Sequence, residues 1–484
     1  MSAELARLGG ALAACGFAVL VASPRRGLRL GGLLALVAGA LSLLVYLSPD
    51  GRERLLAAAA PVGLVLAAGI AFLLHRRPWL LAPAALACVP IRIPVDVGSE
   101  EANLLLPLYG VVAAAGLALA WQLFRGDDRT RELGPLTWPL AAFVAWSGVS
   151  LLWTDDLREG AVALAAFYLP FGVLALSLAR LPWSRRWLSL LHVQLLAMAV
   201  LFAAVGIYQW VAKDVFWNPK VIVGNAYAPF YRVNSLFWDP SIYGRFLVVA
   251  ILAALVTVLW RSDDRAALAP VAVIVAAWVG LLFSFSQSSF IALMAGVLAA
   301  SALHWRWRAA VGLGLAAVLV LSVGFAAPPL RRALGDDLRS GLDAATSGRY
   351  ELVTNGVAIA ADHPLGVGLG GFKRAYAERL GLRGRDPKKA ASHNTPVTVA
   401  AELGAPGFLL FGWLLATAFL LPFRRASASF AGRTSLIVAL TLLAIAVHSL
   451  FYNAFFEDPL TWGLLGLAAL TFAWRTGAAK AEPA

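Results

Sequence analysis

SIYGRFLVVAILAALVTVLW, residues 241–260, is the stretch that decides the class of fold. After Arg245 it contains no charged side chain, and a helix of about twenty apolar residues crosses a hydrocarbon core about 30 Å thick. Apart from a closed barrel, only a helix satisfies its own backbone hydrogen bonds in that setting. The stretch therefore predicts a transmembrane helix.

Apolar blocks of this kind recur from one end of the chain to the other. Of the 484 residues, 60% are hydrophobic and 14% are charged, which excludes a soluble globular protein of ordinary composition. The sequence predicts an all-α, polytopic bundle of about 12–14 transmembrane helices. Fifteen candidate spans form an upper count, because 79–91 is short and bounded by prolines: 6–22, 28–47, 55–74, 79–91, 103–124, 136–153, 160–179, 187–211, 241–260, 267–283, 287–304, 309–327, 396–421, 434–455 and 459–474.

Arginine is distributed unevenly among the connections between these blocks. Arginine-rich loops alternate with loops that are poorer in arginine or contain acids, and the positive-inside rule places the arginine-rich set in the cytoplasm. The two long connections, 213–240 and 328–392, then fall on the outer side, so the chemistry is predicted to face away from the cytoplasm. The net charge of +13 is accordingly a signal of topology, and no nucleic-acid partner is expected.

These patterns divide the chain into four parts. Residues 1–327 are predicted to form N-terminal transmembrane helices with an outer loop at about 213–240, and residues 395–475 to form the C-terminal ones. Residues 328–394 between them are predicted to be a partly helical extracytoplasmic loop. A loop this long inside a compact protein is usually functional or disordered, and this one has helical and turn signals, so we interpret it as the catalytic part. Residues 476–484 are predicted to be a flexible tail.

Two arginines near the predicted outer face are candidates for binding an anion. Arg232 lies in an aromatic outer loop, and Arg245 lies one turn into the 241–260 span. The simpler interpretation is anchoring at the membrane interface, where arginine and aromatic rings are both common. An arginine inside a span is costly, so Arg245 is expected to have an anionic partner.

A third arginine, Arg349, follows Ser347 and Gly348, which resemble the start of a helix. Free backbone donors at a helix N-terminus and an arginine fork together suit a phosphate. The glycine run from Gly366 to Gly371 has neither a preceding strand nor the lysine of a nucleotide-binding loop, so it is predicted to be a turn.

His393 and Asn394 precede the apolar block at 396–421, and Glu402 follows nine residues after His393. With an unperturbed pKa near 6.5, a histidine can accept a proton from a hydroxyl group at neutral pH. The alternative is an interfacial histidine with only a structural role. The paired acids of the loops have no histidine or third carboxylate close by in sequence, so neither a metal nor another cofactor is expected. The other five histidines have simpler interpretations: His75 and His304 at cytoplasmic ends, His192 and His448 packed inside spans, and His363 in a turn before a proline.

In the order of these elements, the chain resembles the O-antigen ligase and O-antigen polymerase (Wzy-type) family of bacterial integral membrane glycosyltransferases. The resemblance covers roughly 190–460. The chain departs from the family pattern in one turn. In this family the turn commonly contains serine followed by arginine, whereas here it contains Ser286-Gln287-Ser288-Ser289, so the role of that arginine is not carried over. The matching motifs are Arg232 before Phe237-Trp238-Asp239-Pro240, a turn at 284–289, Ser347-Gly348-Arg349, the 362–368 segment DHPLGVG, and His393-Asn394 ahead of the 402–407 segment ELGAPG.

The resemblance implies a GT-C-like fold in the bacterial cytoplasmic membrane and transfer of a glycan from undecaprenyl diphosphate to an acceptor hydroxyl on the outer face, without a metal. Arg232 and Arg349, with Arg245 as the alternative to Arg232, would stabilise the departing lipid diphosphate. His393 would deprotonate the acceptor, with inversion at the sugar. Asn394 would hold the ring of His393 or contact the sugar, and Glu402 would orient the imidazole.

Three questions remain open at this point. The acceptor can be a lipid, as in lipopolysaccharide, another glycan or a protein hydroxyl. A ligase acting on a finished polysaccharide is the leading hypothesis, and a polymerase of the same family is the runner-up. A flippase or other transporter of lipid-linked glycans is a third class; it would have functional charges in a cavity between matched halves, and no such repeat is evident here.

Overall fold

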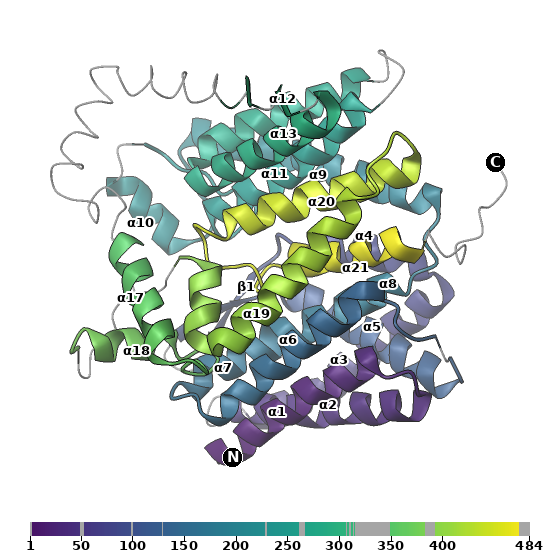
Figure 1. Cartoon of the computed structure of the whole chain (residues 1–484), viewed down its shortest axis with the longest axis vertical. Helices are drawn as coiled ribbons and strands as arrows, with labels where there is room; N and C mark the ends of the chain where they lie inside the picture. Colours follow the sequence, from purple (N-terminus) through teal and green to yellow (C-terminus); the bar gives the residue numbers. More distant parts are fainter. Residues whose placement is uncertain are drawn as a thin grey trace.

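The structure is a computed structural model that describes residues 2–48, 53–97, 100–127, 129–227, 230–260, 267–305, 307–308, 311–312, 314, 349–382 and 393–473. Outside these residues lie the predicted span 309–327 apart from 311–312 and 314, the parts 328–348 (including Ser347 and Gly348) and 383–392 of the predicted loop, and the tail 476–484. The described part is a bundle of helices packed side by side, with α10, α17 and α18 at the left-hand end in Figure 1. The all-α class is confirmed, apart from one short hairpin.

The helices follow the predicted apolar blocks closely. Their starts show ordinary capping chemistry: Ser184, Asp239 and Ser429 each accept a hydrogen bond from a backbone N–H in the first turn of the helix that follows. The longer helices are α1 (Ala3–Ala22), α2 (Arg26–Leu47), α3 (Glu53–Arg76), α5 (Leu106–Phe124), α6 (Thr137–Val149), α8 (Leu169–Ala179), α9 (Arg185–Ala212), α11 (Pro240–Leu259), α12 (Leu268–Ser284), α13 (Gln287–Trp305), α17 (Arg349–Asp362), α19 (Thr395–Phe423), α20 (Phe430–His448) and α21 (Pro459–Ala473).

Short elements connect these helices and modify the prediction in two places. The proline-bounded block 79–91 is not a span of its own, because residues Pro61–Arg76 and Pro78–Cys88 form a pair bent by 116°. The strands β1 and β2 form an antiparallel hairpin in which Ile93 pairs with Leu104, a feature that the sequence did not predict. The short elements are η1 (Pro78–Leu80), α4 (Leu81–Cys88), β1 (Ile93–Val97), β2 (Glu100–Leu104), η2 (Gly134–Leu136), η3 (Ser150–Leu152), α7 (Leu157–Val162), η4 (Ala163–Tyr168), α10 (Pro219–Tyr227) and α18 (Phe372–Arg379).

Ten helices in the described part of the chain are long and apolar enough to cross a membrane, and the bent pair can add one more. Two shorter apolar helices, Leu268–Ser284 and Pro459–Thr471, are further candidates. When the bent pair and these two helices are included, the number of candidate crossings among the described residues falls within the predicted range of about 12–14.

The loops collect at two ends of the bundle, in the two sets that the arginine pattern predicts. At one end lie the contacts of the arginine-rich loops: Arg26 Nε to Leu123 O at 2.6 Å, Arg180 Nη2 to Asp127 Oδ2 at 2.8 Å and Arg433 Nη1 to Trp260 O at 3.2 Å. At the other lie Arg7 Nη2 to Thr154 O at 2.8 Å, Thr154 Oγ1 to Leu369 O at 3.0 Å and Thr395 N to Ser449 O at 2.9 Å. We call the second end the 393 end, because His393 lies there.

Candidate active site

Two of the family-like motifs interlock at the 393 end. Helix α19 is broken at Gly404, whose φ of 65° and ψ of −166° suit only glycine, and Pro406 follows the break. The 364–368 turn fits into the break: Val367 N donates to Ala401 O at 3.0 Å, Gly368 N to Glu402 O at 2.9 Å and Ala405 N to Pro364 O at 2.9 Å. The glycine run is therefore the predicted turn, and it holds the first part of α19 in place.

His393 lies immediately before this first part of α19, with a left-handed φ of 51°. Asn394 caps the helix, since its side-chain oxygen accepts from Val397 N at 3.0 Å while its amide nitrogen donates to Leu450 O at 3.1 Å. Thr395 donates from its hydroxyl to Asn453 Oδ1 at 3.1 Å. These bonds fasten His393 to residues 449–458, the connection between α20 and α21.

The same connection holds Arg245. This side chain is 2% exposed, and its Nε lies 2.9 Å from Asp458 Oδ2, a carboxylate that is also 2% exposed. Its Nη1 donates to Ala454 O at 3.3 Å. The expectation that Arg245 has an anionic partner is confirmed, and the partner lies 213 residues further along the chain.

Arg232 approaches the site from the loop between α10 and α11. The side-chain amide of Asn225 holds its backbone, accepting from Arg232 N at 3.0 Å and donating to Arg232 O at 2.8 Å. The half-buried guanidinium donates from Nε to Ser284 O at 3.2 Å, at the end of α12. Arg232 therefore lies beside the 284–289 turn.

The serine-rich turn between α12 and α13 connects these parts. Ser286 Oγ lies 2.8 Å from Ser289 Oγ, which in turn lies 3.4 Å from Ser241 O at the start of α11. Ser288 Oγ lies 3.0 Å from Nε2 of the buried His448, the last residue of α20. The turn thus joins the Arg232 loop, the helix of Arg245 and the beginning of the 449–458 connection.

Arg349 is the first residue of α17, in agreement with the predicted helix start, and its side chain lies outside what the structure describes. Helix α17 packs alongside the first part of α19, in the same direction: a Cβ added at Gly356 would lie 2.5 Å from Val397 Cγ1, and Pro364 bonds to Ala405. The start of α17 is therefore at the same end as His393 (Figure 1).

Glu402 has other contacts than the predicted one. Its Oε1 accepts from Phe372 N at 3.3 Å, at the start of α18. It lies eight residues beyond Asn394, a rise of about 12 Å in a helix, so the structure does not bring it to the imidazole of His393. Glu402 instead joins α18 to α19.

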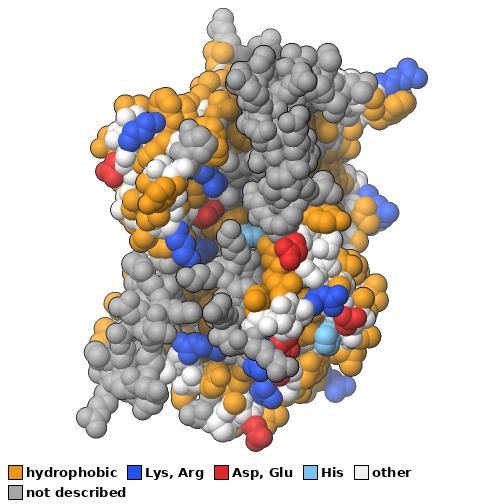
Figure 2. Space-filling model, turned by 90° about the vertical axis from the view of Figure 1, so that its left-hand side faces the viewer, with side chains coloured by type: hydrophobic (Ala, Val, Ile, Leu, Met, Phe, Trp, Pro, Cys, Tyr) orange, Lys and Arg blue, Asp and Glu red, His pale blue; other side chains and the backbone are white. Residues whose placement is uncertain are grey.

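Several charged residues near the site were not identified as site candidates from the sequence. Glu457 has solvent access but is closely surrounded by protein, which raises the pKa of its carboxyl, while the charges of Arg92 and Arg245 act in the opposite direction. Burial is the main reason that the pKa of the neighbouring Tyr452 is raised. The charges of Asp239 and Glu457 raise this pKa further, and the charge of Arg245 lowers it. The only sequence signal for this group was the position of Glu457 and Asp458 in a predicted outer loop. On the surface of this end, basic and acidic side chains are interspersed (Figure 2).

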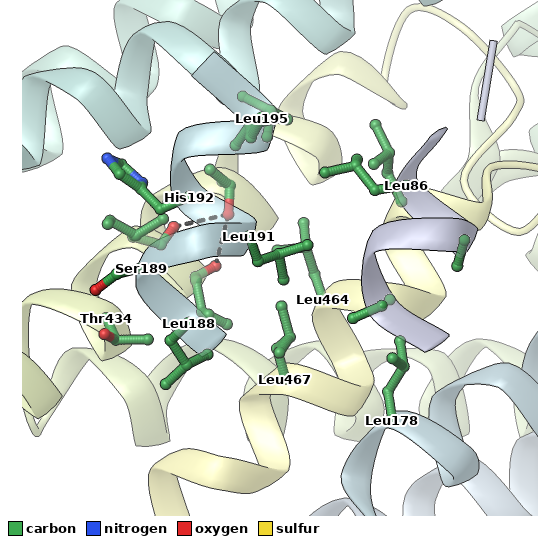
Figure 3. A pocket seen from close by; sticks show the side chains of 18 of the residues that line it. Leu86, Leu178, Leu188, Ser189, Leu191, His192, Leu195, Thr434, Leu464 and Leu467 are labelled. Atoms are coloured by element: carbon green, nitrogen blue, oxygen red, sulfur yellow. Dashed lines mark hydrogen bonds between the residues drawn. The ribbon is translucent and has the colours of Figure 1, made fainter. Parts of the chain in front are cut away.

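An apolar cavity of about 320 Å³ begins beside the Arg245–Asp458 pair. Val249, one turn beyond Arg245, and Pro459, next to Asp458, line its near part. Leu188, Leu191, Leu464 and Leu467 line the part drawn in Figure 3, and His192, whose Nε2 lies 3.1 Å from Thr257 Oγ1, is among the few polar lining residues. The cavity suits a hydrocarbon chain.

The arginines and the histidine at the 393 end, with an apolar cavity that extends from there to Arg433 at the arginine-rich end, identify a multi-pass membrane protein with a candidate site at one end of its helix bundle. The comparison with known families agrees with this class. Residues 271–412, from α12 into α19, match the family model described as O-antigen ligase. The match agrees with the resemblance that the sequence motifs of this region indicated. Among curated proteins, none matches the chain.

Proposed function

We propose that this protein is a metal-independent, inverting glycosyltransferase that moves a glycan from undecaprenyl diphosphate to an acceptor hydroxyl on the outer face of the bacterial cytoplasmic membrane. The observation that carries the proposal is the shared connection 449–458, which contacts both the His393–Thr395 segment and Arg245. A base and a cation that lie far apart in sequence are thereby fastened to the same short segment.

The arginines are assigned to the donor diphosphate. When the bond between the sugar and the diphosphate breaks, the electron pair stays on the phosphate oxygen, and fixed cations lower the energy of that charge. Arg232, which lies beside the 284–289 turn, and Arg245, which pairs with Asp458, are the two positioned guanidinium groups, and Arg232 is kept as the first choice with Arg245 as its alternative. Arg349 is assigned to the same task from the start of α17. The apolar cavity supports the lipid part of the assignment, since it begins one turn beyond Arg245.

His393 is assigned the role of general base. Its imidazole takes the proton of the acceptor hydroxyl as the acceptor oxygen attacks the anomeric carbon from the face opposite the diphosphate, which inverts that centre. Asn394 positions the histidine through the helix cap and its bond to Leu450 O. Glu402 supports the reaction indirectly, by holding α18 against the first part of α19.

The proposal is tested with purified protein in lipid nanodiscs, a carrier-linked glycan and a separate acceptor. His393→Ala should lower transfer by at least about a hundredfold, in the range typical of a lost general base. His363→Ala is the matched control, because this histidine directly follows α17 and its Nδ1 contacts only the nearby Ile359 O among the bonds described. Unchanged transfer by His393→Ala would remove His393 from the mechanism. Transfer that requires the separate acceptor indicates a ligase, whereas a growing ladder from the carrier-linked unit alone indicates the polymerase.

A further inference from the structure

A second amphiphilic pocket lies at the arginine-rich end of the bundle, opposite the 393 end. It has a volume of about 330 Å³, many times the roughly 30 Å³ share of one water molecule. It lies on the inner side of the 116° bend between α3 and α4, next to α5 and the end of α8. One part of its lining is apolar, with Leu74, Leu81 and Leu119, and the other is polar, with His75, Gln122, Arg129, Ser177 and Arg180.

Two buried polar atoms in this lining have no hydrogen-bond partner among the described residues. They are Nε of Arg180, whose side chain is 4% exposed, and Oγ of Ser177, which is 7% exposed. A buried polar group without a partner costs free energy, so such groups are rare unless a ligand or water completes them. Both atoms belong to the last turn of α8, so one ligand can reach both.

Among the residues that the structure describes, guanidinium groups outnumber carboxylates in the ion-pair network beside the pocket. Arg29, Arg129 and Arg180 face two described carboxylates, Asp127 and Glu132. Burial lowers the pKa of Arg180, an effect that a bound anion would oppose. The apolar part of the lining continues from these groups along α4 and α5, which suits an attached hydrocarbon chain.

We propose that this pocket binds the headgroup phosphate of an anionic phospholipid, with Arg129, Arg180 and Ser177 as donors and an acyl chain against the leucines. By the arginine pattern, the lipid belongs to the cytoplasmic leaflet, and basic pockets between transmembrane helices on that side are suited to anionic headgroups. The site is separate from the proposed transfer chemistry and does not depend on it.

The test compares the full-length protein in nanodiscs of phosphatidylcholine alone and of phosphatidylcholine mixed with phosphatidylglycerol. Native mass spectrometry should show one retained phosphatidylglycerol, and the mixed nanodisc should raise the unfolding temperature. Arg129→Gln should weaken retention by about tenfold, the effect of one charge-assisted hydrogen bond. Arg131→Gln is the matched control, because it removes the same charge from the same loop but does not line the pocket.

Ser177→Ala supplies a variant that should fold normally, since the hydroxyl loses no hydrogen bond to any residue that the structure describes. It should retain less phosphatidylglycerol and be as stable as the parent protein in phosphatidylcholine. Equal losses in Arg129→Gln and Arg131→Gln would show diffuse attraction to surface charge and overturn the proposal. It is equally overturned if wild-type protein retains no phosphatidylglycerol, or if inorganic phosphate in phosphatidylcholine nanodiscs gives the same rise in unfolding temperature.

Discussion

Removing the charge of Asp458 tests the centre of the candidate active site most directly. Its Oδ2 lies 2.9 Å from Arg245 Nε, and both side chains are 2% exposed. At an effective dielectric constant of about 20, two unit charges at this separation attract by about 6 kcal/mol. Since the native state also bears the desolvation of both ions, we expect Asp458→Asn to lower the free energy of unfolding by about 3–5 kcal/mol.

Chemical unfolding in detergent micelles measures this loss, and a double variant separates charge from packing. Arg245→Met alone should also destabilise, because it leaves Asp458 buried without its cation. Arg245→Met combined with Asp458→Leu should recover most of the stability, since apolar replacements of a whole buried pair are often neutral or stabilising. If Asp458→Asn unfolds at the same denaturant concentration as the parent protein, water screens the pair and the reasoning is refuted.

The same double variant separates a structural role of Arg245 from donor binding. If the guanidinium also stabilises the departing diphosphate, the double variant should be stable but transfer about a hundredfold more slowly, the effect of one lost electrostatic donor. If it is stable and fully active, Arg245 only holds the 449–458 connection, and the donor assignment is left to Arg232 and Arg349.

Three further predictions concern stability. Gly404→Ala should lower the free energy of unfolding by at least about 3 kcal/mol and abolish most of the activity, because φ is 65° and the new Cβ would lie 2.3 Å from Pro364 O. Gly412→Ala is the control on the same helix. It has open space around it and should be neutral to slightly stabilising in the same thermal unfolding assay. The hydrogen bond from Arg129 lowers the pKa of Asp127 to about 2. The ionised Asp127 therefore stabilises the folded protein above the pKa of about 4 that it has in the unfolded chain, and this stabilisation is lost as the pH falls through about 2. Asp127→Asn should abolish this part of the acid-unfolding curve. Asn394→Ala should lower the free energy of unfolding by about 1 kcal/mol, because it removes both the helix cap and the bond to Leu450 O. The rate of glycan transfer should fall by more than this loss of stability explains.

The spans, the two ends of the bundle and the glycine turn were predictable because each follows from local hydrophobicity, charge or backbone freedom. The need for an anion near Arg245 was also predictable, since burying a lone guanidinium is costly at any position in the fold. The identity of that anion was not predictable, because Asp458 looks in sequence like any loop acid, and only the packing of α11 against α20 brings the connection that contains Asp458 to Arg245. The resemblance implied that Glu402 orients the imidazole of His393, whereas in the structure Glu402 accepts a hydrogen bond from Phe372 N, a contact that depends on the packing of α18 against α19.

Some of the family-like motifs contain residues assigned to the reaction, and others only hold the helices in place. The 362–368 and 402–407 segments bond mainly to each other, so their glycines and prolines make the break in α19 rather than a ligand site. The break has a consequence for His393, since a continuous helix at this position would have no gap for the 364–368 turn. The first part of α19 would then lose its bonds to Val367 and Gly368, and α17 would lose its packing surface beside Val397. The position of the histidine therefore depends on two glycine-containing turns that have no chemical role of their own.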